Sequence, residues 1–390
     1  MIDISKYNQI CTNSRQVREG DIFFAIQGVS QNGEDYIEDA ISAGAGLIVI
    51  DEISTLTDDN YLRVPNIRKF LANVVRQKYL SRVPKYICAV TGTNGKTSVA
   101  HFYKQLINYL GQKSAIFGTT GVGSDIDLKG FGEIPEATTL DVITFTKLLN
   151  YHAEHGVDYI CVEASSHGLH QYRLDSAEFC GMAFTNLTPD HMEYHKDMDD
   201  YFAAKRRLFT DFSTDQSVAV LCNQDRKHHD QIQSVFEGDV ISYGLKGDLY
   251  YQCESDNKVK IFCGDESVTF ESNLYGEFQL ANLCASIGLV IASGFKFSQI
   301  AEHLGKVKSA VGRMQLVRQS SNGAKIFVDY AHTPDALEKA LIECKKLAKG
   351  KLFVVFGCGG ERFHEKRGMM GGIASKYANF VIVTDDNPRS

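Results

Sequence analysis

The sequence predicts a three-domain α/β protein whose central domain is a parallel sheet covered by helices on both faces. At 390 residues the chain is too long for one ordinary core, so two or three domains are expected. Short apolar strands alternate with amphipathic helices from residue 85 onward, a pattern typical of parallel sheets. A further strand–helix series begins near Arg313 and indicates a third unit.

Residues 1–84 are predicted to form a small α/β unit. The apolar segments 21–26 and 46–51 are typical of buried strands, and 36–43 of a short helix.

The central domain is expected to span residues 85–312. Its predicted strands are 86–91, 114–118, 159–163, 182–185 and 218–221, and its predicted helices are 96–110, 140–152, 198–209 and 278–292. Short strand-like stretches between residues 248 and 273 interrupt the alternation.

The third unit, residues 313–390, is expected to be an incomplete Rossmann-like domain. Strands are predicted at 324–329, 352–356 and 380–384, with a helix at 334–348. Too few elements follow for a complete nucleotide-type fold, so we expect a truncated domain.

Composition excludes several classes of protein. Hydrophobic residues make up 44% and charged residues 23% of the chain, and there is no apolar run of 18 residues or basic, apolar leader. We therefore expect a cytoplasmic protein without membrane insertion. A net charge of −7 argues against a nucleic-acid partner. The ten cysteines form no C-x-x-C pair, which favours buried thiols over disulfides or a zinc cage.

The strongest motif is Thr91-Gly-Thr-Asn-Gly-Lys-Thr97, between an apolar strand and an amphipathic helix. Its glycines let backbone N–H groups turn toward phosphate oxygens. Lys96 can reach the β- and γ-phosphates of a nucleotide, and the Thr97 hydroxyl can ligate Mg²⁺. Val90 replaces the first glycine of the full Walker pattern, so the loop is a variant. The alternative is a strand–helix turn without a ligand.

Glu163 and His191 follow the ends of two predicted strands. Ligands bind at this edge of α/β sheets, so both side chains are expected to converge with Thr97 around Mg²⁺. The alternatives are a loop carboxylate for Glu163 and a helix cap for His191. His191 and His195 have zinc-like spacing, but a zinc hydrolase is not favoured because no third ligand is evident.

Motifs along the whole chain resemble those of the Mur ligases. In order they lie at 13–15, 91–97, 138–139, 163–169, 184–191, 201–209, 312–313, 329–334, 356–360 and 386–389. The ordered series is specific, although any single match would be weak. The last motif, Asp-Asn-Pro-Arg, resembles the signature of members that accept meso-diaminopimelate rather than lysine.

The resemblance implies roles for matched residues. Lys96, Lys205 and His191 would be catalytic. ATP would be bound by Gly92, Thr93, Asn94, Gly95, Lys96, Thr97, Ser98, Asn282, Arg313, Asp329 and His332. The UDP-linked precursor would be bound by Ser14, Thr138, Thr139, Ser165 and Arg173, and the amino acid by Arg362, Asp386, Asn387 and Arg389. Metal ligands would be Thr97, Glu163, His191 and Lys205, the last as a carbamate. The alternative for Lys205 is an ordinary solvated lysine on a basic helix.

The sequence departs from the family pattern at three places. Val29-Ser30 replaces a polar pair, Gln279 stands where asparagine is usual, and Phe363 where an acidic residue is usual.

The implied activity is ATP-dependent addition of meso-diaminopimelate to UDP-N-acetylmuramoyl-L-alanyl-D-glutamate through an acyl phosphate, in peptidoglycan precursor synthesis. A monomer is expected, and residues 1–390 alone are expected to add the amino acid poorly. One alternative is a folylpolyglutamate-type ligase, which the N-terminal uridine-binding unit disfavours. The other is a non-catalytic relative that only binds ATP and the UDP-precursor.

Overall fold

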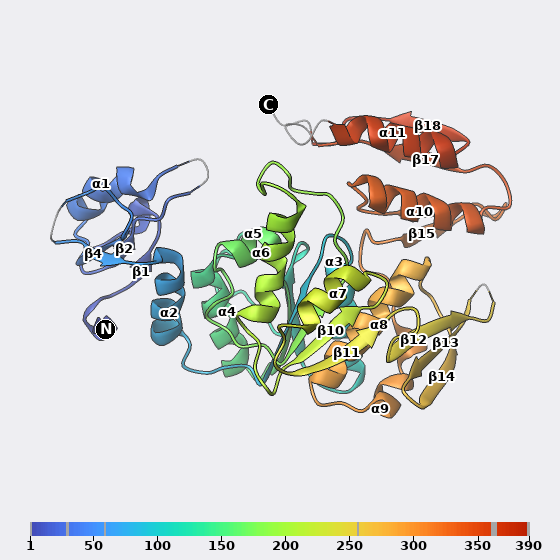
Figure 1. Cartoon of the computed structure of the whole chain (residues 1–390), viewed down its shortest axis with the longest axis horizontal. Coiled ribbons are helices and arrows are strands. Elements are labelled where there is room, and N and C mark those ends of the chain that lie inside the picture. Colours follow the sequence, from blue (N-terminus) through green and yellow to red (C-terminus); the bar gives the residue numbers. More distant parts are fainter. Residues whose placement is uncertain (1, 29–30, 58–59, 256, 360–364, 388–390) are drawn as a thin grey trace.

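The computed structural model describes residues 2–28, 31–57, 60–255, 257–359 and 365–387. Figure 1 shows an N-terminal unit, a large central unit and a C-terminal unit following one another along the chain. This arrangement confirms the α/β class and the parallel-dominated central sheet. No helix in the described ranges combines the length and apolar character needed to cross a membrane.

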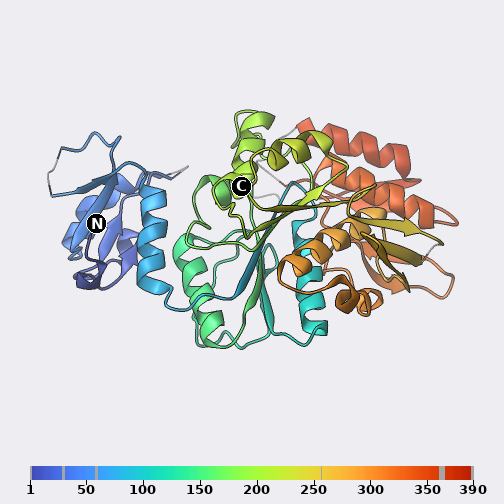
Figure 2. The ribbon, with the colours of Figure 1, turned by 60° about the horizontal axis from the view of Figure 1, so that its bottom comes forward.

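The N-terminal unit is a four-stranded parallel sheet in the order β1-β2-β3-β4. Its elements are β1 (Ile10–Cys11), β2 (Ile22–Phe24), α1 (Ile37–Ser42), β3 (Leu47–Asp51), β4 (Leu62–Val64) and α2 (Ile67–Tyr79). Helix α2 buries Ile67, Leu71 and Val75 at helical spacing. It also contacts α4 of the central unit, as Figure 2 shows, so it joins the two units.

The central unit is built on a ten-stranded sheet in the order β14-β13-β12-β11-β10-β9-β5-β8-β6-β7. The strands are β5 (Tyr86–Thr91), β6 (Ser114–Gly118), β7 (Gly121–Ser124), β8 (Tyr159–Glu163), β9 (Gly181–Phe184), β10 (Val218–Cys222), β11 (Asp239–Tyr243), β12 (Leu249–Cys253), β13 (Lys258–Cys263) and β14 (Glu266–Glu271). From β12 to β6 in this order, each strand pairs in parallel with the next. At the two ends of the sheet, β13 is antiparallel to β12 and to β14, and β7 is antiparallel to β6. The carboxyl ends of the inner strands therefore share one edge.

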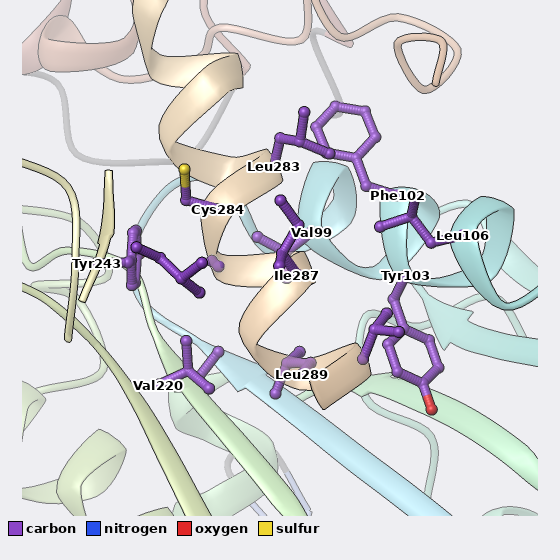
Figure 3. Packing of buried hydrophobic residues seen from close by; sticks show 14 of the residues in the cluster. Val99, Phe102, Tyr103, Leu106, Val220, Tyr243, Leu283, Cys284, Ile287 and Leu289 are labelled. Atoms are coloured by element: carbon purple, nitrogen blue, oxygen red, sulfur yellow. The ribbon is translucent and has the colours of Figure 1, made fainter. Parts of the chain in front are cut away.

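Helices cover both faces of this sheet. They are α3 (Lys96–Tyr109), α4 (Val142–Glu154), α5 (Ser166–His170), α6 (Met198–Thr210), α7 (Arg226–Gln233), α8 (Glu277–Ala292) and α9 (Phe297–Ala301). In β5, Cys88 and Val90 pack on the face covered by α3 and α8, whereas Ile87 and Ala89 pack on the opposite face. Figure 3 shows Val99 of α3 beside Ile287 of α8 in the first of these cores. Strands buried on both faces are expected to be continuously apolar, as these are.

The C-terminal unit contains the antiparallel pair β15 (Gln315–Gln319) and β16 (Lys325–Val328) and the parallel pair β17 (Phe353–Phe356) and β18 (Phe380–Val383). Helices α10 (Pro334–Leu347) and α11 (Glu365–Tyr377) pack on each other. Leu337, Leu341 and Met370 form a small core with β17 and β18.

Candidate active site

The loop between β5 and α3 depends on two glycines. Gly92 and Gly95 have φ angles of +139° and +95°, which are costly for residues with a side chain. A Cβ on Gly92 would lie 1.9 Å from Thr185 Oγ1, and one on Gly95 would lie 2.5 Å from Asn282 Oδ1. The glycines thus permit both the turn and the close approach of neighbouring elements. Thr93 and Ser98 are buried around the same turn, which leads directly into the N-terminus of α3, a favourable site for phosphate.

Two lysines, the half-buried Lys96 and the buried Lys205, meet at this loop. Lys96 Nζ donates to the carbonyl oxygens of Gly92 and Thr93, each at 2.9 Å. Lys205 Nζ, from α6, donates to the same Gly92 oxygen at 2.9 Å, and Lys205 is only 1% exposed. Burial lowers the pKa of both ammonium groups, and the charge of Lys96 lowers the Lys205 pKa further. The alternative of a solvated Lys205 is therefore wrong.

Glu163, at the end of β8, is 2% exposed and faces the phosphate loop. Its Oε2 accepts a hydrogen bond from the Thr97 hydroxyl at 3.0 Å. Arg313 Nη2 donates to the same hydroxyl oxygen at 3.0 Å. The carboxylate and hydroxyl oxygens are hard ligands of the kind Mg²⁺ prefers, so Thr97 and Glu163 fit this ion. Arg313 adds a cation from the C-terminal unit.

His191 lies in the loop after β9 but is paired with acids. Its φ is +59°, and its ring nitrogens lie 3.4 Å from Asp190 and 3.6 Å from Glu193. Burial lowers the pKa of its imidazole. It does not cap α6, because Asp197 does. The described residues contain no group of three His, Cys, Asp or Glu side chains that could hold a metal ion. The structure thus joins Thr97 to Glu163 by a hydrogen bond. It places His191 among acidic neighbours and within reach of the charges of Lys205 and Lys96, which lower its pKa further.

Two contacts bring the C-terminal unit against this region. Asn94 Nδ2 donates to Asp335 Oδ2 at 3.2 Å. His332 Nε2 lies 3.7 Å from Asp190 Oδ2. Burial raises the pKa of Asp190, but the nearby His332 and His191 hold it well below its usual range.

The other residues expected on the ATP side position Arg313. Asp329 accepts from the Met314 N–H at 2.7 Å. Gln279 Nε2 donates to the Arg313 carbonyl at 2.9 Å, and Asn282 Nδ2 donates to Gln279 Oε1 at 3.3 Å. Gln279, a departure from the family pattern, therefore connects α8 to the arginine loop.

Four residues expected to bind the precursor lie together. Thr139 Oγ1 donates to the Glu163 carbonyl at 2.7 Å and accepts from the Ser165 N–H at 2.9 Å. Arg173 Nη1 donates to the Thr139 carbonyl at 2.8 Å. Thr138 precedes Thr139 in the chain, and its hydroxyl oxygen lies 3.0 Å from that of Thr119, the residue after β6.

A cavity of about 380 Å³ opens between the N-terminal and central units. It is lined by Thr12, Ile26, Arg68, Leu71, Pro135, Ala137, Asp141, Val142, Ile143, Gln171 and Arg173. Arg68 donates to the Gln27 carbonyl at 2.8 Å, and Arg173 donates to Gln171 Oε1 at 2.8 Å. In these contacts the guanidinium groups of both arginines, which line the cavity, donate to uncharged oxygens. Ser14 is buried at the start of a 3₁₀ helix, Ser14–Gln16, two residues from this lining. The sequence interpretation missed Arg68.

The amino-acid side is only partly described. Arg362 and Arg389 lie outside the described residues, as do Val29, Ser30 and Phe363. Asp386 and Asn387 follow β18, and Asn387 has a φ of +45°.

A second cavity, of about 360 Å³, lies between the loop after β9 and helices α10 and α11. It is lined by Thr188, Pro189, Asp190, His191, Met192, Glu193, Thr333, Pro334, Asp335, Glu338, Lys366, Met369 and Ile373. Lys366 Nζ donates to the His332 carbonyl at 3.1 Å. This basic group was also missed from the sequence.

The fold and the site define a nucleotide-binding α/β protein with a phosphate loop at the edge of a parallel sheet and an arginine supplied by the following unit. More closely, the chain belongs to the Mur ligase family. Residues 6–79 match "Mur ligase family, catalytic domain", residues 90–290 match "Mur ligase middle domain", and residues 312–390 match "Mur ligase, glutamate ligase domain".

Three of the similar proteins share one name. UDP-N-acetylmuramoyl-L-alanyl-D-glutamate–2,6-diaminopimelate ligase of Rickettsia typhi is 38% identical over 98% of this chain and 79% of its own length. The ligase of the same name from Rhizobium meliloti is 39% identical over 98% of this chain and 79% of its length. A solved structure of a ligase with this name superposes with a TM-score of 0.76 at 32% identity, covering 98% of this chain and 79% of that one.

Proposed function

We propose that this chain is an ATP-dependent ligase that joins meso-diaminopimelate to the D-glutamyl carboxylate of UDP-N-acetylmuramoyl-L-alanyl-D-glutamate. One observation carries the proposal: Lys96, Glu163 and Arg313 converge on a glycine-dependent phosphate loop in a chain that resembles ligases of this name over nearly its whole length.

We assign one task to each unit. Residues 1–84 would hold the uridine nucleotide, residues 85–312 the ATP and the peptide end of the precursor, and residues 313–390 the amino acid. The cavity lined by Arg68 and Arg173 supports the first boundary, because guanidinium groups suit phosphate and carboxylate oxygens. Arg362, Asp386, Asn387 and Arg389 are proposed for diaminopimelate on the family resemblance alone.

The chemistry requires activation of a carboxylate, which is a poor acyl donor at neutral pH. The glutamyl carboxylate attacks the γ-phosphorus of ATP, a new P–O bond forms, and the bond to ADP breaks. Lys96 and Arg313 supply positive charge where it develops on the phosphate oxygens. The neutral amine of diaminopimelate then attacks the acyl carbon and a C–N bond forms. The C–O bond to phosphate breaks, and the nitrogen loses one proton as inorganic phosphate leaves, which gives the amide.

Thr97 and Glu163 would hold Mg²⁺, which when bound neutralises phosphate charge. The protein residues bind and orient the nucleotide around it. Asn94 contacts Asp335 and His332 contacts Asp190 across the two units. Closure of the units through such contacts would exclude water from the acyl phosphate.

We further propose that Lys205 carries a carbamate. Lys205 is only 1% exposed and lies near the charge of Lys96. Both effects lower its pKa, which favours the neutral amine over the ammonium form. The ammonium group first loses one proton to give the neutral amine. The amine then attacks CO₂: a C–N bond forms, one C=O π bond opens, a second proton is released, and the product is an anionic carbamate. That anion would offset the charge of Lys96 and provide oxygen ligands.

Carbon-13 NMR of the protein in labelled bicarbonate tests this step. A carbamate signal is expected in the wild type and absent in Lys205→Ala. Equal spectra for the two proteins would refute the carbamate.

Activity is tested by measuring ADP release and product mass with the UDP-dipeptide precursor and either meso-diaminopimelate or lysine. We expect product with diaminopimelate. Product only with lysine would refute the specificity. ATP and precursor binding without product would favour the non-catalytic alternative, and turnover of a folate substrate would favour the folylpolyglutamate-type ligase.

We place the reaction in the cytoplasm as a monomer. The ten cysteines are all free thiols, as expected in a reducing compartment. Sedimentation of the purified chain would test the monomer.

A further inference from the structure

Glu163 is held by more than the phosphate loop. The Thr119 backbone N–H donates to Glu163 Oε1 at 3.0 Å, and the Thr119 hydroxyl donates to Oε2 at 3.1 Å. Both bonds come from the residue just after β6, which pairs with β8 in parallel. Two hydrogen bonds from one residue to both oxygens fix the rotation of the carboxylate as well as its place.

The absence of a side chain at Gly118 leaves space for the Glu163 carboxylate. A Cβ on Gly118 would lie 2.1 Å from Glu163 Oε1 and 2.6 Å from its Cδ. Such distances require the carboxylate to move. Gly118, the last residue of β6, thus leaves space for the carboxylate, and Thr119, directly after the strand, donates hydrogen bonds to it.

The hydroxyl protons then determine the direction of the next bond. The Thr119 and Thr138 hydroxyl oxygens are 3.0 Å apart. Each hydroxyl has one proton, and an ionised carboxylate only accepts. Because the Thr119 proton is given to Glu163, Thr138 must donate to Thr119. Thr138 consequently offers only lone pairs to a ligand and selects an N–H or O–H group of the precursor.

We propose that Thr119 is a positioning residue that couples the two substrates of the ligase. It orients Glu163 for the metal–nucleotide complex, and through Thr138 it links that carboxylate to the precursor's peptide. Because both sites need the same arrangement of Glu163, Thr119 and Thr138, a ligand that stabilises this arrangement at one site favours binding at the other, and the coupling is reciprocal. This inference rests on the proposed function for the identity of the precursor.

The test compares Thr119→Val, which removes the hydroxyl and keeps the shape and the backbone N–H, with Thr119→Ser, which keeps the hydroxyl. Binding of the ATP analogue AMPPNP is measured by calorimetry over a range of Mg²⁺ concentrations, with and without the UDP-dipeptide precursor. In Thr119→Val the Mg²⁺-dependent affinity should fall about ten- to hundredfold, as for loss of one hydrogen bond to a charged group. The gain in affinity caused by the precursor should disappear. Thr119→Ser should restore both.

Thr120→Val is the matched control, because the exposed Thr120 hydroxyl lies 3.0 Å from His101 Nε2 and away from Glu163. It should bind as the wild type does. Gly118→Ala is a second route to the same defect, and its thermal unfolding midpoint shows whether it is folded.

Unchanged Mg²⁺ dependence and unchanged coupling in folded Thr119→Val would overturn the proposal. If the wild type binds no precursor, the proposed substrate is wrong, and the Mg²⁺ dependence of AMPPNP binding alone still decides whether Thr119 positions Glu163.

Discussion

His167 is a half-buried base whose protonation opposes folding. Its ring centroid lies 3.9 Å from that of Tyr194, and burial, with the nearby His191, lowers its pKa from 6.5 to about 4. The unfolded chain therefore binds the proton more tightly, so this contribution to stability is complete above pH 6.5 and is lost as the pH falls toward 4.

We expect the free energy of unfolding to decrease from pH 7 to pH 4 and His167→Gln to flatten part of that decrease. Urea unfolding at several pH values measures both. A His167→Gln protein with the full wild-type pH dependence would contradict the assignment.

At the residue scale, the sequence predicts groups that follow strand ends or lie in a local motif. Lys96, Thr97 and Glu163 are of this kind. Thr119 also follows a predicted strand, 114–118, but the partners that give it a role lie 19 and 44 residues away. No local pattern marks these contacts or the place of Arg68 in the cavity lining. The burial of Lys205 was also hidden, since its neighbours along α6 are Arg206 and Arg207.

At the scale of elements, Arg207 links α6 to α5 and to the segment that follows α5. It donates to the Leu169 carbonyl at 2.5 Å and to Asp175 Oδ2 at 3.0 Å. The two side chains of this pair are 12% and 11% exposed. Arg207→Met leaves a buried carboxylate without its cation and should destabilise the protein by about 3–5 kcal/mol.

Chemical denaturation of Arg207→Met, Asp211→Asn and the double variant Arg207→Met/Asp175→Leu measures this effect. Asp211 is 40% exposed, so its replacement should cost less than about 1 kcal/mol. The double variant should recover part of the loss. Equal stability of Arg207→Met and Asp211→Asn would show that burial of the pair is unimportant.

Most elements were predictable because their strands are buried on both faces and their helices are amphipathic. Strands β1 and β4 are two and three residues long, too short for a periodic signal. Helix α2 was missed although Asn66 caps it and Ile67, Leu71 and Val75 mark its apolar face. The position of β5 between β8 and β9 depends on contacts distant in sequence, which periodicity does not encode.

At the scale of the whole molecule, nucleotide binding should depend on the C-terminal unit. Arg313 reaches Thr97 of α3 and also lies 4.3 Å over the Tyr330 ring. Arg313→Met should weaken AMPPNP binding by about 1.5–3 kcal/mol, the usual range for a hydrogen bond to a charged group. Arg318→Met, an exposed arginine on β15, is the calorimetric control. Equal affinity of the two variants would exclude Arg313 from the nucleotide site.

The precursor should bind across the N-terminal and central units. Arg68 comes from α2 and Arg173 from the segment after α5, yet both line the same cavity. Burial lowers the pKa of both guanidinium groups, and the charge of Arg173 lowers the pKa of Arg68 further. An anion bound between the two would offset this repulsion. Arg68→Met should therefore weaken binding of the UDP-precursor by about 1.5–3 kcal/mol and leave AMPPNP affinity unchanged. Arg63→Met, in β4 of the same unit and exposed, should change neither affinity. If Arg68→Met weakened nucleotide binding instead, or matched Arg63→Met in precursor binding, the cavity would not be where the precursor's anionic groups bind.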